Sequence, residues 1–203
     1  MTAALACVVL TGIGVAVAGR NTPGPIDGRV MDLAGDAWLD PGIGLRLADL
    51  AFDPLSVVLV AAALAWYCHR RRLTRLAVLA VAAPGLTGVL TTGLKVLVGR
   101  TIHGPNLSYP SGHTAAATAI TLVFALLVVN RGRFTRGPAY LLVLGPAVLV
   151  GGAQAVVQVL MSSHYLSDTI GGFAVAVAAT LGAGLAIDAH VPRRRRRDAS
   201  TAP

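Results

Sequence analysis

Charged side chains are scarce in this sequence. Only 13% of its residues are charged, whereas a soluble domain usually carries about 25%. Glutamate is absent, and Lys95 is the only lysine. Apolar residues make up 55% of the chain and gather in runs long enough to cross a bilayer. The shortage of charge therefore argues against a water-soluble protein and predicts a single-domain integral membrane protein.

Cysteines are equally few. Cys7 and Cys68 both lie in apolar segments, which excludes a disulfide framework. The net charge of +8 would suit nucleic acid, but no aromatic residues are interleaved with the arginines, so we expect no nucleic-acid partner. Most basic residues instead border apolar runs, which is the positive-inside pattern of membrane proteins. They form three clusters: Arg70, Arg71, Arg72 and Arg75; Arg131, Arg133 and Arg136; and Arg193 to Arg197.

The apolar runs predict an all-α polytopic membrane bundle of about six transmembrane helices. Residues 1–192 form the membrane-embedded domain, and residues 193–203 are expected to be a disordered basic cytoplasmic tail. Ala16-Val17-Ala18 resembles a signal-peptidase site, but no basic residue precedes the run, which favours a retained first helix. The six runs are residues 2–19, 50–68, 76–98, 114–129, 140–161 and 166–187.

Residues 20–48 differ from the spans because they contain prolines and aspartates. Apolar residues at helical spacing predict a short amphipathic helix on the outer membrane surface, with Trp38 as its anchor. We expect its aspartates to form a solvated face. The apolar positions are Val30, Leu33, Ala34, Ala37 and Trp38, and the aspartates are Asp27, Asp32, Asp36 and Asp40.

The charge pattern also predicts which loops share a membrane face. With the three basic clusters in the cytoplasm, loops 99–113 and 162–165 lie outside, together with residues 20–48. The sequence therefore predicts a multi-pass cell-membrane protein with one outward-facing polar site. The abundance of Ala, Val and Arg is typical of a bacterium with a GC-rich genome.

The stretch Ser111-Gly112-His113 opens the fourth predicted span. A helix N-terminus presents unpaired amides and the positive end of a dipole, which together bind anions. Ser111 is expected to cap the helix and donate to a phosphate oxygen, and Gly112 lets a ligand approach the backbone. An ordinary helix start is the alternative.

A second stretch places His164 and Asp168 four residues apart, on one face of a helix. A carboxylate that binds one imidazole nitrogen makes the other a better nucleophile. Lys95 and Arg100 lead into the Ser111 loop and are expected to neutralise a phosphate dianion; the alternative for Lys95 is that it extends to the headgroups. His103 either contacts substrate or merely lies in the loop.

A metal site is not expected. His103, His113, His164 and Asp168 include only one carboxylate, and the nearby cations would repel a metal ion. No cofactor is predicted either.

These residues resemble the type-2 phosphatidic acid phosphatase superfamily, also called lipid phosphate phosphatases. The family has three motifs: Lys, six residues, Arg-Pro; Pro-Ser-Gly-His; and Ser-Arg, five residues, His, three residues, Asp. They match here at Lys95, at Pro110 to His113, and at His164 with Asp168.

The chain is a divergent member by this resemblance, since both motif arginines are replaced. The first Arg-Pro falls on Ile102-His103, and the Ser-Arg falls on Val157-Gln158. Arg100 is expected to take over phosphate binding, and Gln158 offers a neutral donor, which is about half as strong as a charged one.

The resemblance implies a metal-independent hydrolysis of a phosphomonoester or pyrophosphate on a prenyl lipid or glycerolipid at the outer face. His164 would form a phosphohistidine, His113 would act as acid and then base, and Asp168 would hold His164. The alternatives are a non-catalytic lipid-phosphate binder or scaffold and, less favoured, a transporter. The sequence does not determine the oligomeric state.

Overall fold

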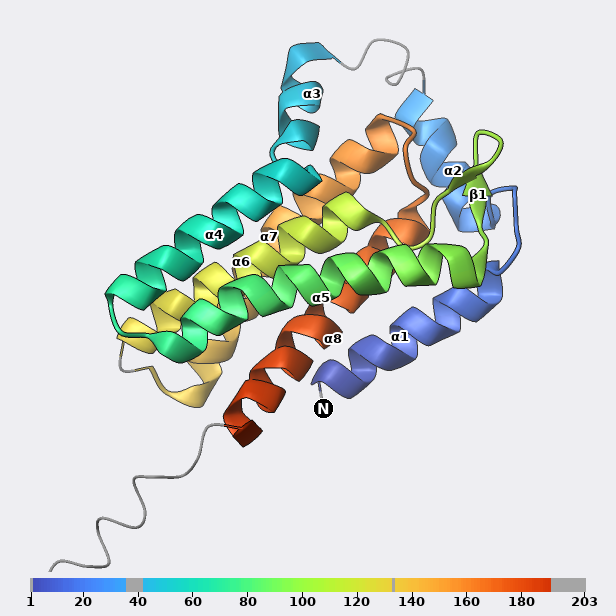
Figure 1. Cartoon of the computed structure of the whole chain (residues 1–203). Helices are drawn as coiled ribbons and strands as arrows, with labels where there is room; N and C mark the ends of the chain where they lie inside the picture. Colours follow the sequence, from blue (N-terminus) through green and yellow to red (C-terminus); the bar gives the residue numbers. More distant parts are fainter. Residues whose placement is uncertain (1, 36–41, 133, 191–203) are drawn as a thin grey trace, which may run out of the picture.

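The chain folds into a helical bundle, which confirms the predicted all-α class (Figure 1). The computed structural model describes residues 2–35, 42–132 and 134–190, and the side chain of Arg136 is not described. The helices are α1 (Thr2–Val17), α2 (Pro25–Ala34), α3 (Gly42–Leu50), α4 (Pro54–Arg70), α5 (Thr74–Val98), α6 (Gly112–Arg131), α7 (Arg136–Leu160) and α8 (Leu166–His190).

Four helices, α5 to α8, are long and apolar enough to span a membrane within the described residues. The pair α3 and α4 passes the same test as one span bent by 53°. The bend has a local cause: Asp53 caps α4 by accepting a 2.9 Å hydrogen bond from the Ser56 amide, and Pro54 follows it. The first helix, α1, has 16 residues and a length of about 24 Å, so it is shorter than a bilayer core. The polytopic prediction is confirmed.

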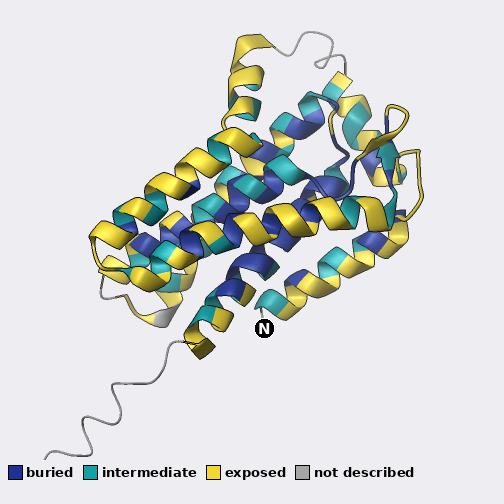
Figure 2. Ribbon diagram, viewed as in Figure 1, coloured by how far each residue is buried: buried dark blue, intermediate teal, exposed yellow. Residues whose placement is uncertain are grey.

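Helix α8 runs through the middle of the bundle and packs against α1, α5 and α6 (Figure 2). Small side chains make this packing close: Ala115 and Ala119 of α6 meet Ala176 of α8. The outer faces of α4 and α5 are exposed and apolar, as lipid-facing surfaces are; Leu97, for example, is 80% exposed.

One end of the bundle, termed the basic end, carries Arg75 and Arg131. There Arg131 lies over the ring of Tyr67, 5.1 Å from its centroid, and Arg75 forms an ion pair with Asp188. At the other end the Ser111 amide donates a 2.9 Å hydrogen bond to the Asp168 carbonyl. The loops that carry His113 and His164 therefore share one end, as the charge pattern predicted.

Two details of this end were not predicted. Residues 20–48 contain two helices, α2 and α3, rather than one. Residues 99–113 contain an antiparallel hairpin of β1 (Thr101–Ile102) and β2 (Asn106–Leu107). The expected anchor Trp38, the aspartates Asp36 and Asp40, and the basic tail from residue 193 lie outside the described residues.

Candidate active site

Ser111 caps the N-terminus of α6, as expected from its sequence. It adopts an extended backbone, and its Oγ accepts a 3.4 Å hydrogen bond from the Thr114 amide. A side chain at Gly112 would meet nothing within 4 Å, so the space before the helix amides is open. The geometry therefore leaves room for an anion at this helix end.

Helix α8 approaches this loop through two glycines. A Cβ at Gly172 would lie 2.4 Å from the Ser111 carbonyl oxygen, and one at Gly171 would lie 2.5 Å from the Tyr109 ring. Any larger residue would force the two segments apart. The Tyr109 hydroxyl donates a 2.7 Å hydrogen bond to the Leu10 carbonyl, and burial raises the pKa of Tyr109 to about 12. The loop is thus held between α1 and α8.

His164 and Asp168 lie together at the start of α8. The distance from His164 Nδ1 to Asp168 Oδ2 is 3.8 Å, slightly longer than a hydrogen bond. Both side chains are buried, and His164 Nδ1 has no hydrogen-bond partner among the described residues. Asp168 Oδ2 also accepts a 3.0 Å bond from the Tyr165 amide. A small movement would complete the pair, as often happens when substrate binds.

Arg100 lies fully buried between two carboxylates. It follows Gly99, whose φ of 64° ends α5. Its guanidinium donates 2.6 Å hydrogen bonds to Asp168 Oδ1, Asp27 Oδ2 and Ser167 Oγ. It also stacks on Tyr165, 4.2 Å from the ring centroid. The guanidinium does point towards His164 and Asp168, but its charge is already matched by carboxylates.

Asp27 is buried, 5% exposed, so its expected place on a solvated face is wrong. The reason is its partners: it binds Arg100, and its Oδ1 accepts a 2.9 Å hydrogen bond from the Ser167 amide. Burial alone would raise the pKa of Asp27, but the bonds from Arg100 and Ser167 hold it below its usual value. Asp32, on the same helix, is exposed as expected.

Lys95 lies in the last turn of α5 and is partly exposed. Its charge acts on both His113 and Asp168, which places it in electrostatic range of the site. No side-chain hydrogen bond or ion pair of Lys95 occurs within the described part of the chain. Unlike Arg100, this cation is available to a ligand.

Asp49 of α3 is a site residue that the sequence did not reveal. Its Oδ1 accepts a 2.6 Å hydrogen bond from Gln158 Nε2 and lies 3.5 Å from His113 Nε2. The backbone carbonyl of Gln158 accepts from the amide of His164, so all four residues are adjacent. An aspartate before an apolar run is typical of an ordinary helix end, and no signal in the sequence links Asp49 to His113.

His103 lies in the hairpin between α5 and α6. Its Nε2 is 3.0 Å from both the carbonyl oxygen and the Oγ of Ser162, which ties the hairpin to the turn between α7 and α8. A cavity of about 360 Å³ lies beside this contact. It is lined by Ile102, His103, Asn106, Met161, Ser162 and Ser163.

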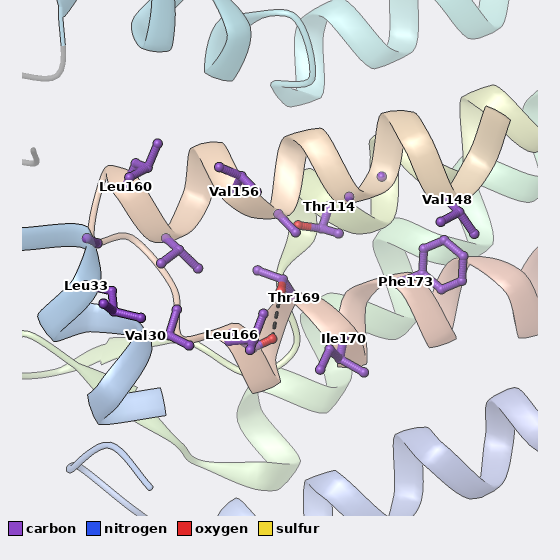
Figure 3. A pocket seen from close by; sticks show the side chains of 15 residues that line it. Val30, Leu33, Thr114, Val148, Val156, Leu160, Leu166, Thr169, Ile170 and Phe173 are labelled. Atoms are coloured by element: carbon purple, nitrogen blue, oxygen red, sulfur yellow. Dashed lines mark hydrogen bonds between the residues drawn. The ribbon is translucent and has the colours of Figure 1, made fainter. Parts of the chain in front are cut away.

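An apolar groove of about 530 Å³ lies between α7 and α8 (Figure 3). One end is covered by Val30 and Leu33 of α2, and Thr114 of α6 forms part of its wall. Thr114 is the residue whose amide binds Ser111. Thr114 therefore borders both the groove and the capped start of α6.

Comparison with known proteins agrees with this geometry. A profile of the PAP2 superfamily matches residues 76–190, whereas no curated protein gave a significant match. The fold is similar to the crystal structure described as the first transmembrane PAP2 type phosphatidylglycerolphosphate phosphatase from Bacillus subtilis. The TM-score is 0.68 at 16% identity, over 95% of this chain and 98% of that chain. At this identity the likeness concerns the fold alone. The matched segment covers more than half of the chain and includes Lys95, Ser111, His113, His164 and Asp168, so the chain belongs to the PAP2 superfamily.

Proposed function

We propose that this chain hydrolyses a phosphomonoester or pyrophosphate carried by a membrane lipid, at the extracytoplasmic face and without a metal ion. One observation carries the proposal. The direct hydrogen bond between Ser111 and Asp168 joins the helix start that carries His113 to the helix start that follows His164. An anion bound at the amides of α6 would then lie between two imidazoles.

The groove between α7 and α8 supports a lipid rather than a soluble phosphate ester. Its lining is almost wholly apolar, and it includes Thr114, which lies three residues after Ser111. A prenyl or acyl chain in this groove would leave its phosphate at the helix end beside Ser111.

The reaction proceeds through two displacements. His164 Nε2 attacks phosphorus in line while Nδ1–H faces Asp168, and the bond from phosphorus to the lipid oxygen breaks. His113 gives its proton to that oxygen. It then takes a proton from water, and the hydroxide attacks the phosphohistidine, which releases phosphate and restores both imidazoles.

Charge stabilisation in this scheme comes mainly from Lys95 and the helix start. Ser111 Oγ, the Gly112 amide and the Lys95 ammonium stabilise the oxygens around phosphorus. Gln158 offers a neutral amide. Arg100 is paired with two carboxylates. Its role in this scheme is to hold Asp168 in place and not to bind phosphate by itself.

The test is phosphate release from prenyl and glycerolipid phosphates by the purified chain in detergent containing EDTA. Wild type should turn over and form an acid-labile, base-stable phosphoenzyme. His164→Ala should lower turnover at least about a thousandfold and abolish the phosphoenzyme. His69→Ala, an exposed histidine at the basic end, is the matched control and should match wild type. Retained activity in His164→Ala would refute the assigned nucleophile.

A second function remains supported by one observation. The buried arginine is neutralised by Asp27 and Asp168, so the site has fewer free cations than the family's motifs provide. A binder or scaffold for lipid phosphates would hold them without turnover, and His164→Ala would not weaken that binding.

A further inference from the structure

We propose that Asp27, which lies outside the segment matched by the family profile, is a positioning residue that keeps the charge opposite His164 negative. The proposal rests on the function proposed above. Asp27 belongs to α2, 73 residues before Arg100 in the sequence. Its carboxylate nevertheless reaches the centre of the catalytic cluster.

The first argument is charge. Arg100 donates to Asp168 Oδ1 at 2.6 Å, and a guanidinium this close would cancel the charge of a single carboxylate. Asp27 binds the other end of the same guanidinium, also at 2.6 Å. Two carboxylates and one guanidinium leave a net charge of −1 facing His164. Without Asp27, the pair of Arg100 and Asp168 would be neutral.

The second argument is burial. Arg100 is 0% exposed, Asp168 is 0% exposed and Asp27 is 5% exposed, so water does little to screen these charges. A buried ion pair that loses one partner leaves an uncompensated charge, which is costly. The cluster therefore functions as a unit, and the first turn of α8 is part of it because Asp27 also binds the Ser167 amide and hydroxyl.

The charge on the cluster matters for catalysis because His164 becomes positively charged during attack on phosphorus. A negative group 3.8 Å from Nδ1 stabilises that charge and strengthens the nucleophile. The other charged or titratable groups around His164 come from several elements. They are Lys95 of α5, Arg100 after α5, His113 of α6, Asp49 of α3, Tyr165 beside it and Asp168 of α8.

Asp27→Asn tests the proposal because it keeps the shape of the side chain and removes its charge. We expect kcat/KM near neutral pH to fall at least about tenfold. We also expect the acid side of the pH–rate profile to move to lower pH, since the imidazole of His164 then stays neutral in more acidic solution. Asp32→Asn, an exposed position on the same helix, is the control and should change neither.

A merely structural role predicts a different result. Damaged packing lowers the rate at every pH but leaves the acid side of the profile in place, and that outcome would overturn the proposal. If Asp27→Asn folds poorly, Asp27→Glu replaces it: it retains the charge, so its acid side should coincide with that of wild type, and a shift would count against the proposal.

A readout without turnover separates this proposal from the proposed function. In wild-type protein with labelled histidine, the His164 ring signals should titrate at higher pH than in Asp27→Asn. That shift should appear even if the wild-type chain releases no phosphate. Equal titration of the two proteins would refute the role of Asp27, whereas absent turnover alone would refute only the phosphatase.

Discussion

The side-chain amide of Gln158 donates a 2.6 Å hydrogen bond to the carboxylate of Asp49, although 109 residues separate them. The same carboxylate oxygen lies 3.5 Å from His113 Nε2. A phosphate bound as proposed above would compete with this carboxylate for Gln158 and His113. Asp49 is therefore expected to oppose phosphate binding.

Asp49→Asn should strengthen phosphate binding. A carboxylate within about 4 Å of a bound anion costs about 1 kcal/mol in water and more near a protein surface. The inhibition constant of inorganic phosphate should therefore fall at least about fivefold. Asp188→Asn, at the basic end, is the control for a lost carboxylate. Unchanged or weaker inhibition in Asp49→Asn would mean that the carboxylate serves His113 rather than opposing phosphate.

Lys95→Ala should lower kcat/KM by about a hundredfold to a thousandfold, because it removes the cation that no described carboxylate neutralises. Lys95→Arg should recover part of this loss, since the charge returns with a different shape. Steady-state kinetics on one lipid phosphate provide the measurement. Arg75→Ala, at the basic end of the bundle, should leave kcat/KM unchanged, and an equal loss there would assign the effect to folding.

Gly152→Leu should fill part of the groove between α7 and α8. A Cβ at Gly152 meets nothing within 4 Å, so the new side chain enters without a backbone clash. The displaced part of the lipid chain moves into equally apolar detergent or lipid, so the cost is roughly ten lost van der Waals contacts of about 0.1–0.2 kcal/mol each. The kcat/KM for a long-chain phosphate should therefore fall about tenfold relative to a short-chain ester.

Gly145→Leu is the matched control for this prediction. Gly145 lies on the same helix, also has open space at its Cβ, and does not line the groove. It should leave the preference between long and short chains unaltered. An equal loss on both substrates in Gly152→Leu would place the lipid chain elsewhere.

Acid should destabilise the fold partly through Asp27. The pKa of this carboxyl is lower in the folded chain than its ordinary 3.8, so its contribution is present above that value and is lost as the pH falls through the folded-state pKa. Hydrogen bonds to charged groups contribute about 1.5–3 kcal/mol, which lowers Tm by roughly 3–12 °C in Asp27→Asn at pH 6. Thermal unfolding in detergent should show this gap closing as the pH falls below 3.8.

Hydrophobic patterning was sufficient to predict the long helices α4 to α8, because apolar runs must be buried in lipid or protein wherever they occur. Runs 76–98 and 166–187 correspond closely to α5 and α8. The alternation of basic loops also predicted that His113 and His164 share one end. The helix positions depend on local sequence, and the shared end follows from counting the spans between the two loops. Both can therefore be predicted from a single sequence.

Contacts between loops far apart in the sequence could not be predicted in this way. Asp27 was expected on a solvated face and Asp49 was not singled out, because no candidate site residue lies near either one in the sequence. Their partners, Arg100 and His113, become neighbours only when α2 and α3 fold over the ends of α5 to α8. These contacts depend on the length and direction of the connecting segments, which hydrophobic periodicity does not indicate.

The buried pair of Asp27 and Arg100 joins the first quarter of the chain to the segment that the family profile recognises. Relatives could differ in where each supplies the second carboxylate. Exchanging residues 1–75 between two such proteins would leave the motifs in place but would separate Asp27 from Arg100. In a family tree, these two positions should therefore change together, even though every motif histidine stays the same.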